Sequence, residues 1–240
     1  MTSEEHEARL VWDRIFGDRD KAGKTGGRYF YQLALEKVRT GETICDAGCG
    51  YTFYLHDLMR RCGPSGSFVG IDFSSVALAQ SRELAVGYPN AHLALADMLH
   101  LPMPDNSVDR VFCAETLPYL LGDIEKALKE LSRVAKKEVI FSLHTRGTYE
   151  IKGTQTEFRD NIVIEHKPGS KPPRRIFDEE GILKLVENVG CLKLEIMQPL
   201  RWGEIYEVPD GREWPWFLPP RTRIALYYIA VSKINPCPPS

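Results

Sequence analysis

The stretch ICDAGCGYT, residues 44–52, joins an apolar segment to a glycine turn. The apolar residues predict a buried strand, and Asp46 stands at the point where this strand should end. Gly48 and Gly50 follow, and glycines at such a turn let the backbone approach a ligand and leave N–H groups free at the next helix. The stretch therefore predicts a ligand site at the end of the first strand of an α/β sheet.

Strand-like and helix-like segments alternate beyond this turn. The strands expected from the apolar patterns are Thr43–Asp46, Ser67–Asp72, Ala91–Ala96, Arg110–Ala114, Val139–Leu143, Cys191–Met197 and Arg223–Ser232. The expected helices are Phe53–Arg61, Ser75–Val86, Asp123–Ala135 and Asp178–Val189, the last two each capped by its first Asp. This order predicts a doubly wound, mostly parallel seven-stranded sheet with helices on both faces and an antiparallel last strand.

Composition places the chain among ordinary globular proteins. Of its 240 residues, 43% are hydrophobic and 27% charged, and the formal net charge is -2. A protein that coats nucleic acid usually carries a marked basic excess, so a nucleic-acid partner is not expected. We find no secretory signal and no apolar run long enough to span a membrane. The six cysteines form no C-x-x-C pair, so we expect free thiols, no metal site and a cytoplasmic location.

Three acidic residues fall at successive strand ends, where open parallel sheets bind ligands. Asp72 lies just over 20 residues beyond the glycine turn, a spacing typical of a carboxylate that binds a ribose diol. Asp97 is then placed to bind the exocyclic amine of an adenine, with Met98 covering the ring. Asp46 is suited to a ligand ammonium group, which a dinucleotide pyrophosphate lacks. Strand four leads into Glu115, which we add to the ligand-facing residues.

Five ordered blocks of sequence carry a resemblance to a known family. They lie in four stretches: TGETICDAGCG, GPSGSFVGIDFS, ALADMLHLPMPDNSVDRVFCAETL, and ALKELSRVAKKEVIFS, which holds both a helix and a strand. With these blocks the chain resembles the class I S-adenosylmethionine-dependent methyltransferases, and within them the small-molecule group related to ubiquinone and menaquinone methylases. The match runs from about Val38 to Leu143.

The resemblance implies S-adenosylmethionine as cofactor. The glycine turn, with Asp46, Gly48, Cys49 and Gly50, would hold its methionine part. Asp72 would bind the ribose, Phe73 would lie beside the adenine, and Asp97 and Met98 would bind it. Two departures stand out. Tyr51 and Thr52 replace the third glycine of the first motif, and Pro118 and Tyr119 replace a frequent pair of histidines, so no catalytic base is carried over.

The acceptor side offers two candidate catalytic residues. His144 follows the fifth strand on the ligand-binding edge, where it can serve as a general base near neutral pH. Tyr119 is the second candidate. We expect a single domain over 1–240, with a helical lead-in or lid at 1–40, a cofactor-binding core at 38–145 and acceptor-side insertions and closing strands at 146–240. The predicted partner is a small-molecule acceptor, methylated at an O, N or C atom by in-line displacement, and a homodimer is possible.

Other functions share parts of this pattern. A nicotinamide-dependent oxidoreductase has the glycine turn and the spacing to Asp72, but its fingerprint needs a third glycine where Phe53 stands. Such an enzyme also gives Asp46 and Asp97 no role. Methylation of RNA or protein is a further alternative, as is a cofactor-binding module without turnover.

Overall fold

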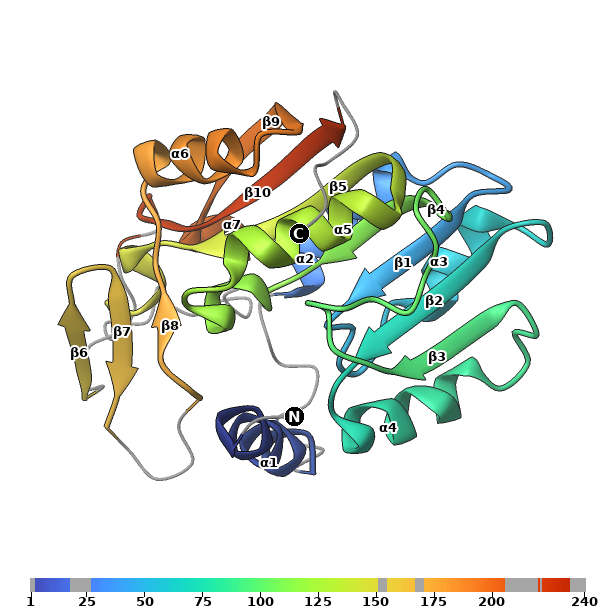
Figure 1. Ribbon diagram of the computed structural model, residues 1–240, viewed down its shortest axis with the longest axis horizontal. Coiled ribbons are helices and arrows are strands. Elements are labelled where there is room, and N and C mark those ends of the chain that lie inside the picture. The colour runs from blue at the N-terminus through green and yellow to red at the C-terminus, as the bar shows by residue number, and fades with distance from the viewer. Residues whose placement is uncertain are drawn as a thin grey trace, which may run out of the picture.

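The central feature of the computed structural model is a seven-stranded sheet (Figure 1). The structure describes residues 3–17, 27–150, 155–166, 171–205, 220 and 222–233. In sheet order the strands are β3 (Ala91–Leu95), β2 (Ser67–Asp72), β1 (Thr43–Ala47), β4 (Val108–Cys113), β5 (Ala135–His144), β10 (Ile224–Lys233) and β9 (Leu192–Arg201). The first five strands in this order, β3, β2, β1, β4 and β5, run parallel, while β10 is antiparallel to both β5 and β9. The predicted sheet is confirmed.

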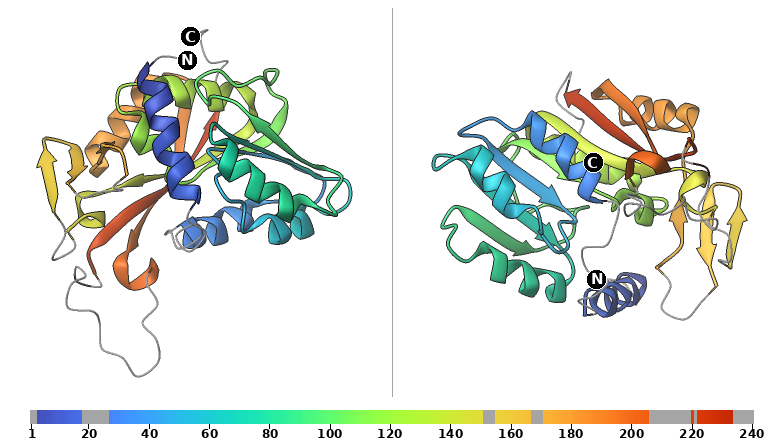
Figure 2. Two further views of the ribbon diagram at one scale, coloured as in Figure 1. Left: turned by 90° about the horizontal axis from the view of Figure 1, so that it is seen from below. Right: turned by 180° about the vertical axis from the view of Figure 1, so that it is seen from behind.

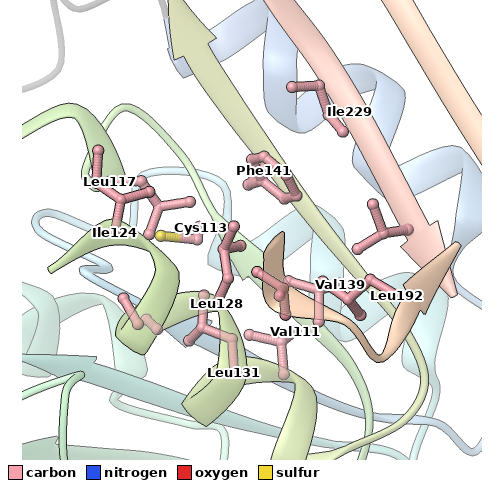
Figure 3. Close-up of a cluster of buried hydrophobic side chains, with 14 of the residues drawn as sticks. Val111, Cys113, Leu117, Ile124, Leu128, Leu131, Val139, Phe141, Leu192 and Ile229 are labelled. Atoms are coloured by element: carbon pink, nitrogen blue, oxygen red, sulfur yellow. The ribbon is translucent and has the colours of Figure 1, made fainter. Parts of the chain in front are cut away.

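Helices cover both faces of the sheet. The helices α2 (Gly27–Lys37), α3 (Leu55–Cys62) and α4 (Ser75–Ala85) lie on one side, and α5 (Ile124–Val134) and α6 (Glu179–Val189) on the other. Because neighbouring strand residues point to opposite faces, Ile44 packs with the α2 and α3 side whereas Cys45 packs with the α5 and α6 side. Figure 3 shows the second core, in which Leu128 and Leu131 of α5 meet Val111 and Val139 of the sheet.

Two helix starts were predicted to be capped by aspartate, and one of them is. The side chain of Asp178 accepts a 2.8 Å hydrogen bond from the N–H of Gly181 at the start of α6. Asp123 occupies the corresponding position before α5 but its side chain makes no capping hydrogen bond, so that prediction is wrong. The φ of -102° and ψ of 11° at Asp123 differ from the extended backbone of Asp178, and N-cap residues are typically extended.

A small second sheet follows β5 through the short helix η2 (Arg146–Thr148). It consists of β6 (Thr156–Arg159), β7 (Ile162–Glu165) and β8 (Arg174–Arg175), all antiparallel. The composition of Lys167–Arg175, rich in proline and basic residues, predicts a loop, but Arg174 and Arg175 at its end pair with β7. Arg174 is almost fully buried and forms a 2.9 Å ion pair with Glu165. The charge is thus paired inside this sheet.

The described cysteines differ in their bonding state. Cys45, Cys49, Cys62 and Cys113 are free and buried as expected. Cys191 is disulfide-bonded, so the expectation of a free thiol is wrong there.

No helix in the described part of the chain is both long and apolar enough to cross a membrane.

The three remaining helices lie at the ligand-binding edge or near it. They are α1 (Ser3–Gly17), η1 (Leu117–Leu120) and α7 (Trp202–Ile205). Viewed from below, α1 lies between α4 and the three-stranded sheet (Figure 2, left). The segment from Trp202 to Phe217 is rich in aromatic residues, which predicts an acceptor wall, a lid core or a dimer contact, but most of it falls outside the described residues.

Candidate functional site

The carboxyl ends of β1, β2 and β4 meet where the strand order reverses on either side of β1. This is the position at which open α/β sheets bind ligands. A cavity of about 110 Å³ opens here. Its lining comes from the glycine turn, the end of β4, α1, α2 and the segment before β8: Trp12, Ile15, Phe16, Tyr31, Gly48, Cys49, Gly50, Tyr51, Phe53, Ala114, Glu115, Thr116 and Lys171.

Asp46 is fully buried at the end of β1, beside this cavity. The hydroxyl of Tyr31 on α2 donates a 2.7 Å hydrogen bond to its Oδ2 atom. The hydroxyl of Tyr54, the residue before α3, donates to the same oxygen. Its other oxygen, Oδ1, is buried without a hydrogen-bond partner among the described residues. The carboxylate is therefore held through Oδ2, while Oδ1 has no donor among the described residues.

Burial decides the ionisation of Asp46. Removal from water raises the pKa of this carboxyl to about 7, and the two phenol hydrogen bonds, which lower it, offset only part of that effect. The nearby carboxylate of Asp72 raises it further. A ligand that brings a positive charge to Oδ1 would oppose these effects and favour the ionised form.

The glycine turn leaves no room for side chains. Gly48 has a φ of 76°, and a Cβ atom there would overlap the side chain of Thr116. Gly50 has a φ of 50°, and a Cβ atom there would lie 3.0 Å from the ring of Phe16. Both residues line the cavity, with Cys49 between them. Backbone, not side chain, thus forms this wall, as the sequence predicted for a close approach to a ligand.

Asp72 ends β2 and is tied to the glycine turn. Its Oδ2 atom accepts a 2.8 Å hydrogen bond from the N–H of Gly50, and its Oδ1 atom accepts one of 2.8 Å from the N–H of Ser74. Burial raises the pKa of Asp72 to about 6, although these backbone hydrogen bonds lower it. Neither Asp72 nor the half-buried Phe73 lines the cavity. Asp72 fixes the turn's geometry in this state of the molecule.

Asp97 and Met98 lie further from the cavity. Asp97 is exposed, and its Oδ1 atom accepts a 2.9 Å hydrogen bond from the N–H of Leu99 two residues on. Met98 is buried in the core on the α5 side of the sheet. The structure thus gives Asp97 a turn-stabilising contact and does not bring it into the cavity with Gly48 and Gly50.

Helix α1 covers the mouth of the site. Oγ of Ser74 donates a 2.5 Å hydrogen bond to Oδ1 of Asp13, and Nε2 of Gln80 donates one of 2.6 Å to the carbonyl oxygen of Phe16. Phe16 and Trp12 both line the cavity. The cavity beneath them is smaller than the roughly 300 Å³ at which small-molecule sites begin. Helix α1 therefore closes most of the space that a nucleoside ligand needs.

An aromatic group extends from α1 toward the acceptor-side residues. The rings of Trp12 and Tyr119 meet edge to face with centroids 4.9 Å apart. Tyr119 in turn meets the ring of His144 edge to face at 6.4 Å. His144 is buried at the end of β5, and its Nδ1 atom shares a hydrogen bond with the hydroxyl of Tyr149. The structure thus brings the two candidate catalytic residues together, behind Trp12.

Charged residues surround this aromatic group. The ammonium of Lys171 lies 5.9 Å from the ring centre of Trp12 and 6.0 Å from that of Tyr119. Burial, with Lys171 and Arg174 nearby, lowers the pKa of His144 to about 3, so the imidazole is neutral near pH 7. Burial raises the pKa of Tyr119, which keeps its hydroxyl protonated.

Glu115 connects the two halves of the site. It lines the cavity with a φ of 52°, which is uncommon for a residue other than glycine, and its N–H donates a 2.8 Å hydrogen bond to Oγ of Ser142. Burial raises the pKa of its carboxyl, and the ammonium of Lys171 lowers it. Strain of this kind tends to gather at functional sites.

Sequence reasoning missed several residues of the site. Tyr31 and Tyr54 contact Asp46 from segments 15 and 8 residues away along the chain. Asp13 reaches Ser74 across 61 residues. No local motif predicts such contacts, because they depend on how α1 and α2 pack onto the sheet. Tyr31 is one of several aromatic residues in the N-terminal forty, but their presence in the sequence specifies no partner.

Comparison with known proteins identifies the family. A family model described as a methyltransferase domain matches residues 39–186. A 2-phytyl-1,4-naphtoquinone methyltransferase of Trichormus variabilis is 30% identical over 174 residues, which cover 66% of this chain and 74% of the relative. A demethylmenaquinone methyltransferase of Staphylococcus aureus is 36% identical over 102 residues, or 41% of each chain.

Solved structures share the fold. An S-adenosylmethionine-dependent methyltransferase of Aquifex aeolicus superposes with a TM-score of 0.56 at 21% identity, covering 85% of this chain and 89% of the other. A Burkholderia thailandensis 1,6-didemethyltoxoflavin-N1-methyltransferase gives 0.66 at 12% identity, covering 98% and 92%. The chain belongs to the S-adenosylmethionine-dependent methyltransferases. It is an enzyme of that class, and S-adenosylmethionine is its cofactor.

The residues of the site suit this cofactor. A buried carboxylate oxygen without a partner, on Asp46, matches a ligand that carries an ammonium group. Gly48 lines the cavity with backbone only, and a single added methyl group there would overlap the side chain of Thr116. These features lie on the same edge of the sheet, at the end of β1.

Proposed function

We propose that this methyltransferase acts on a small aromatic acceptor of quinone type, in its reduced form. The relatives named for 2-phytyl-1,4-naphtoquinone and demethylmenaquinone support the class of acceptor. The single observation that carries the proposal is the aromatic group of Trp12, Tyr119 and Tyr149 around the neutral His144, next to the cofactor cavity. Aromatic walls favour a flat, apolar ring.

In this proposal the cofactor lies along the ends of β1 and β2. Asp46 binds its ammonium group, and the backbone from Gly48 through Cys49 to Gly50 lies against its methionine part. Asp72 binds the ribose, with Phe73 beside the adenine, and Asp97 and Met98 complete the adenine end. Glu115 closes the cavity toward the acceptor.

S-adenosylmethionine supplies a methyl group already activated by a sulfonium sulfur. The acceptor atom attacks the methyl carbon in line with the S–C bond, and the bonding pair stays on the sulfur of the neutral thioether product. The protein has to align the acceptor and exclude water, and alignment alone is able to contribute about 7–11 kcal/mol. Trp12 and Phe16 on α1 exclude water from the site, since both line its cavity.

His144 takes the proton that the acceptor loses. With Nδ1–H donated to the hydroxyl of Tyr149, the lone pair of Nε2 is free to accept a proton from an acceptor hydroxyl. The lowered pKa of His144 keeps the imidazole neutral near pH 7, but a pKa so far below the working pH also makes it a weak proton acceptor in this closed arrangement. Tyr119 stays protonated, and its ring lies against the bound acceptor in this proposal.

The domain layout follows from this division of roles. The lead-in at 1–40 acts as a lid through α1 and contributes Tyr31 through α2. The core at 38–145 binds the cofactor. The acceptor-side part at 146–240 carries Tyr149, the three-stranded sheet and the closing strands. Lid opening exposes Tyr119 and His144 at the same time as the cofactor cavity, because Trp12 lies against Tyr119.

The test uses defined acceptors. The protein is incubated with S-adenosylmethionine and chemically reduced 2-substituted 1,4-naphthoquinones that lack a ring methyl, and products are identified by mass spectrometry. We expect a product heavier by one methylene group and its loss in the His144→Asn variant. Turnover of RNA or protein in place of these acceptors would contradict the proposal.

A further inference from the structure

Two tyrosines from different parts of the chain meet at one carboxylate oxygen. Tyr31 comes from α2 and Tyr54 from the segment before α3. Their rings stack with centroids 3.6 Å apart and an interplanar angle of 13°. Both hydroxyls bond Oδ2 of Asp46. Both tyrosines are buried, so the stacked pair and the carboxylate form one packed unit.

The two oxygens of Asp46 are treated unequally. Oδ2 receives two phenol hydrogen bonds, while Oδ1 is buried with no hydrogen-bond partner in the part of the chain that the structure describes. Leaving a buried acceptor without a donor is costly, and native proteins seldom do so. Because both phenols donate to Oδ2, the carboxylate cannot rotate to give Oδ1 a hydrogen bond without losing those two. The arrangement reserves Oδ1 for a donor from outside the protein.

The ligand cavity lies next to this unit. Tyr31 lines the cavity together with Gly48 and Cys49, two and three residues after Asp46. Tyr31 therefore contacts both the cavity and the carboxylate of Asp46. The phenol is neutral, because burial and the carboxylate beside it raise the pKa of Tyr31. It therefore keeps the proton that it donates to Oδ2 of Asp46.

We propose that Tyr31 and Tyr54 are positioning residues for the amino-acid end of the cofactor, holding Asp46 so that Oδ1 receives the cofactor's ammonium group. The inference rests on the family's cofactor and not on the identity of the acceptor. It gives helix α2 a part in cofactor selection, because a nucleoside without an amino-acid group makes no use of the clamped carboxylate.

The experiment compares two ligands that differ at that end. S-adenosylhomocysteine carries the ammonium group, whereas 5′-methylthioadenosine has the same nucleoside and thioether without it. Affinities of both are measured by calorimetry for the wild type, Tyr31→Phe and Tyr54→Phe, with competition titration for the weaker ligand. Each variant is expected to lose about tenfold in affinity for S-adenosylhomocysteine, since it loses a hydrogen bond to a charged group. Affinity for 5′-methylthioadenosine should not change.

A merely structural role gives a different pattern. Loss of packing would weaken both ligands alike, and either an equal loss or no loss at all overturns the proposal. Tyr228→Phe is the matched control, because it removes a buried hydroxyl that has no hydrogen-bond partner among the described residues. It should leave both affinities unchanged. Thermal unfolding without ligand checks that each variant folds.

A double-mutant cycle isolates the coupling to Asp46. In the Asp46→Asn background, Tyr31→Phe should cost less than twofold in affinity for S-adenosylhomocysteine, because the charge it helps to place is gone. A full tenfold loss in that background would contradict the proposed role. If the wild type binds neither ligand, the cofactor assignment fails and the proposal with it, which distinguishes that outcome from a failure of Tyr31 alone.

Discussion

Oγ of Ser74, the N-cap residue of α4, donates a 2.5 Å hydrogen bond to Oδ1 of Asp13 on α1. This contact fastens the first helix over the carboxyl ends of β1 and β2. Ser74 and helix α1 are thus joined directly at the cofactor site. Binding of the cofactor therefore has to compete with the closed position of α1.

The first prediction concerns this lid. Asp13→Ala removes the acceptor for Ser74, so α1 should open more often and S-adenosylhomocysteine should associate several times faster. Stopped-flow fluorescence reports the rate, because Trp12 on α1 lines the cavity. Leu10→Ala, at an exposed position of the same helix, is the control and should leave the rate unchanged. An association rate in Asp13→Ala equal to that of the wild type would rule out a gating role for this contact.

The second prediction tests the glycine wall. Gly48→Ala places a methyl group into Thr116 at a φ of 76°, so we expect a loss of about 1–3 kcal/mol in the free energy of unfolding. Denaturant titration measures it. The double variant with Thr116→Ala removes the overlap and should recover part of the loss. No recovery would mean that the backbone conformation alone determines the cost.

The third prediction follows from the raised pKa of Asp46. An unfolded aspartate has a pKa near 3.8 and the native one about 7, so the native state binds the proton more tightly. The contribution of Asp46 to the free energy of unfolding is greatest below about pH 4. It is lost as the pH rises to 7, by up to about 4 kcal/mol. Asp46→Asn should therefore stabilise the ligand-free protein increasingly between pH 4 and 7.

Denaturant titrations of both proteins across that range provide the measurement. Taking the difference between the wild type and Asp46→Asn cancels the pH-dependent contributions of titratable groups far from the site. The groups that interact with Asp46 are Tyr31, Tyr54, Asp72, Cys45, Cys49 and Cys113. Burial raises the pKa of Asp72 to about 6, so Asp72→Asn should show the same trend over a narrower window. A difference between wild type and Asp46→Asn that does not depend on pH would refute this explanation.

The sequence predicted the sheet because each core strand is a short apolar run between turn residues. Strand β2, Ser67–Asp72, has the predicted limits, and the others differ by a few residues at their ends. The small sheet was missed because its strands are short: β6 and β7 have four residues each, and β8 has only Arg174 and Arg175, in a stretch rich in proline and charge. Its strand conformation depends on pairing with β7 and on the ion pair with Glu165.

The site was predicted where chemistry follows from position along a strand. Asp46, Gly48, Gly50 and Glu115 lie at one edge because parallel strands end together. The partners of these residues could not be predicted, since the contact of Tyr31 with Asp46 depends on where α2 packs. The local hydrogen bond from Leu99 to Asp97 is likewise a detail of the turn that spacing does not specify.

The fourth prediction concerns His144. If its Nε2 atom takes the acceptor proton, His144→Asn should lower kcat by about 10²–10⁴-fold, the usual contribution of a general base. Affinity for S-adenosylhomocysteine should stay within twofold. Because the pKa of His144 is lowered to about 3, the wild-type kcat should show no inflection near 6.5 that disappears in the variant. Such an inflection would mean that the imidazole is charged under working conditions.

The most direct test of a small aromatic acceptor is the fate of the methyl group itself. The protein is supplied with S-adenosylmethionine labelled in its methyl group and with a reduced cell extract, and the label is then partitioned between organic-extractable molecules and precipitated RNA and protein. We predict that the label enters an aromatic compound in the organic fraction and that His144→Asn abolishes this incorporation. Label recovered in RNA or protein, with none in the organic fraction, would contradict the proposed function.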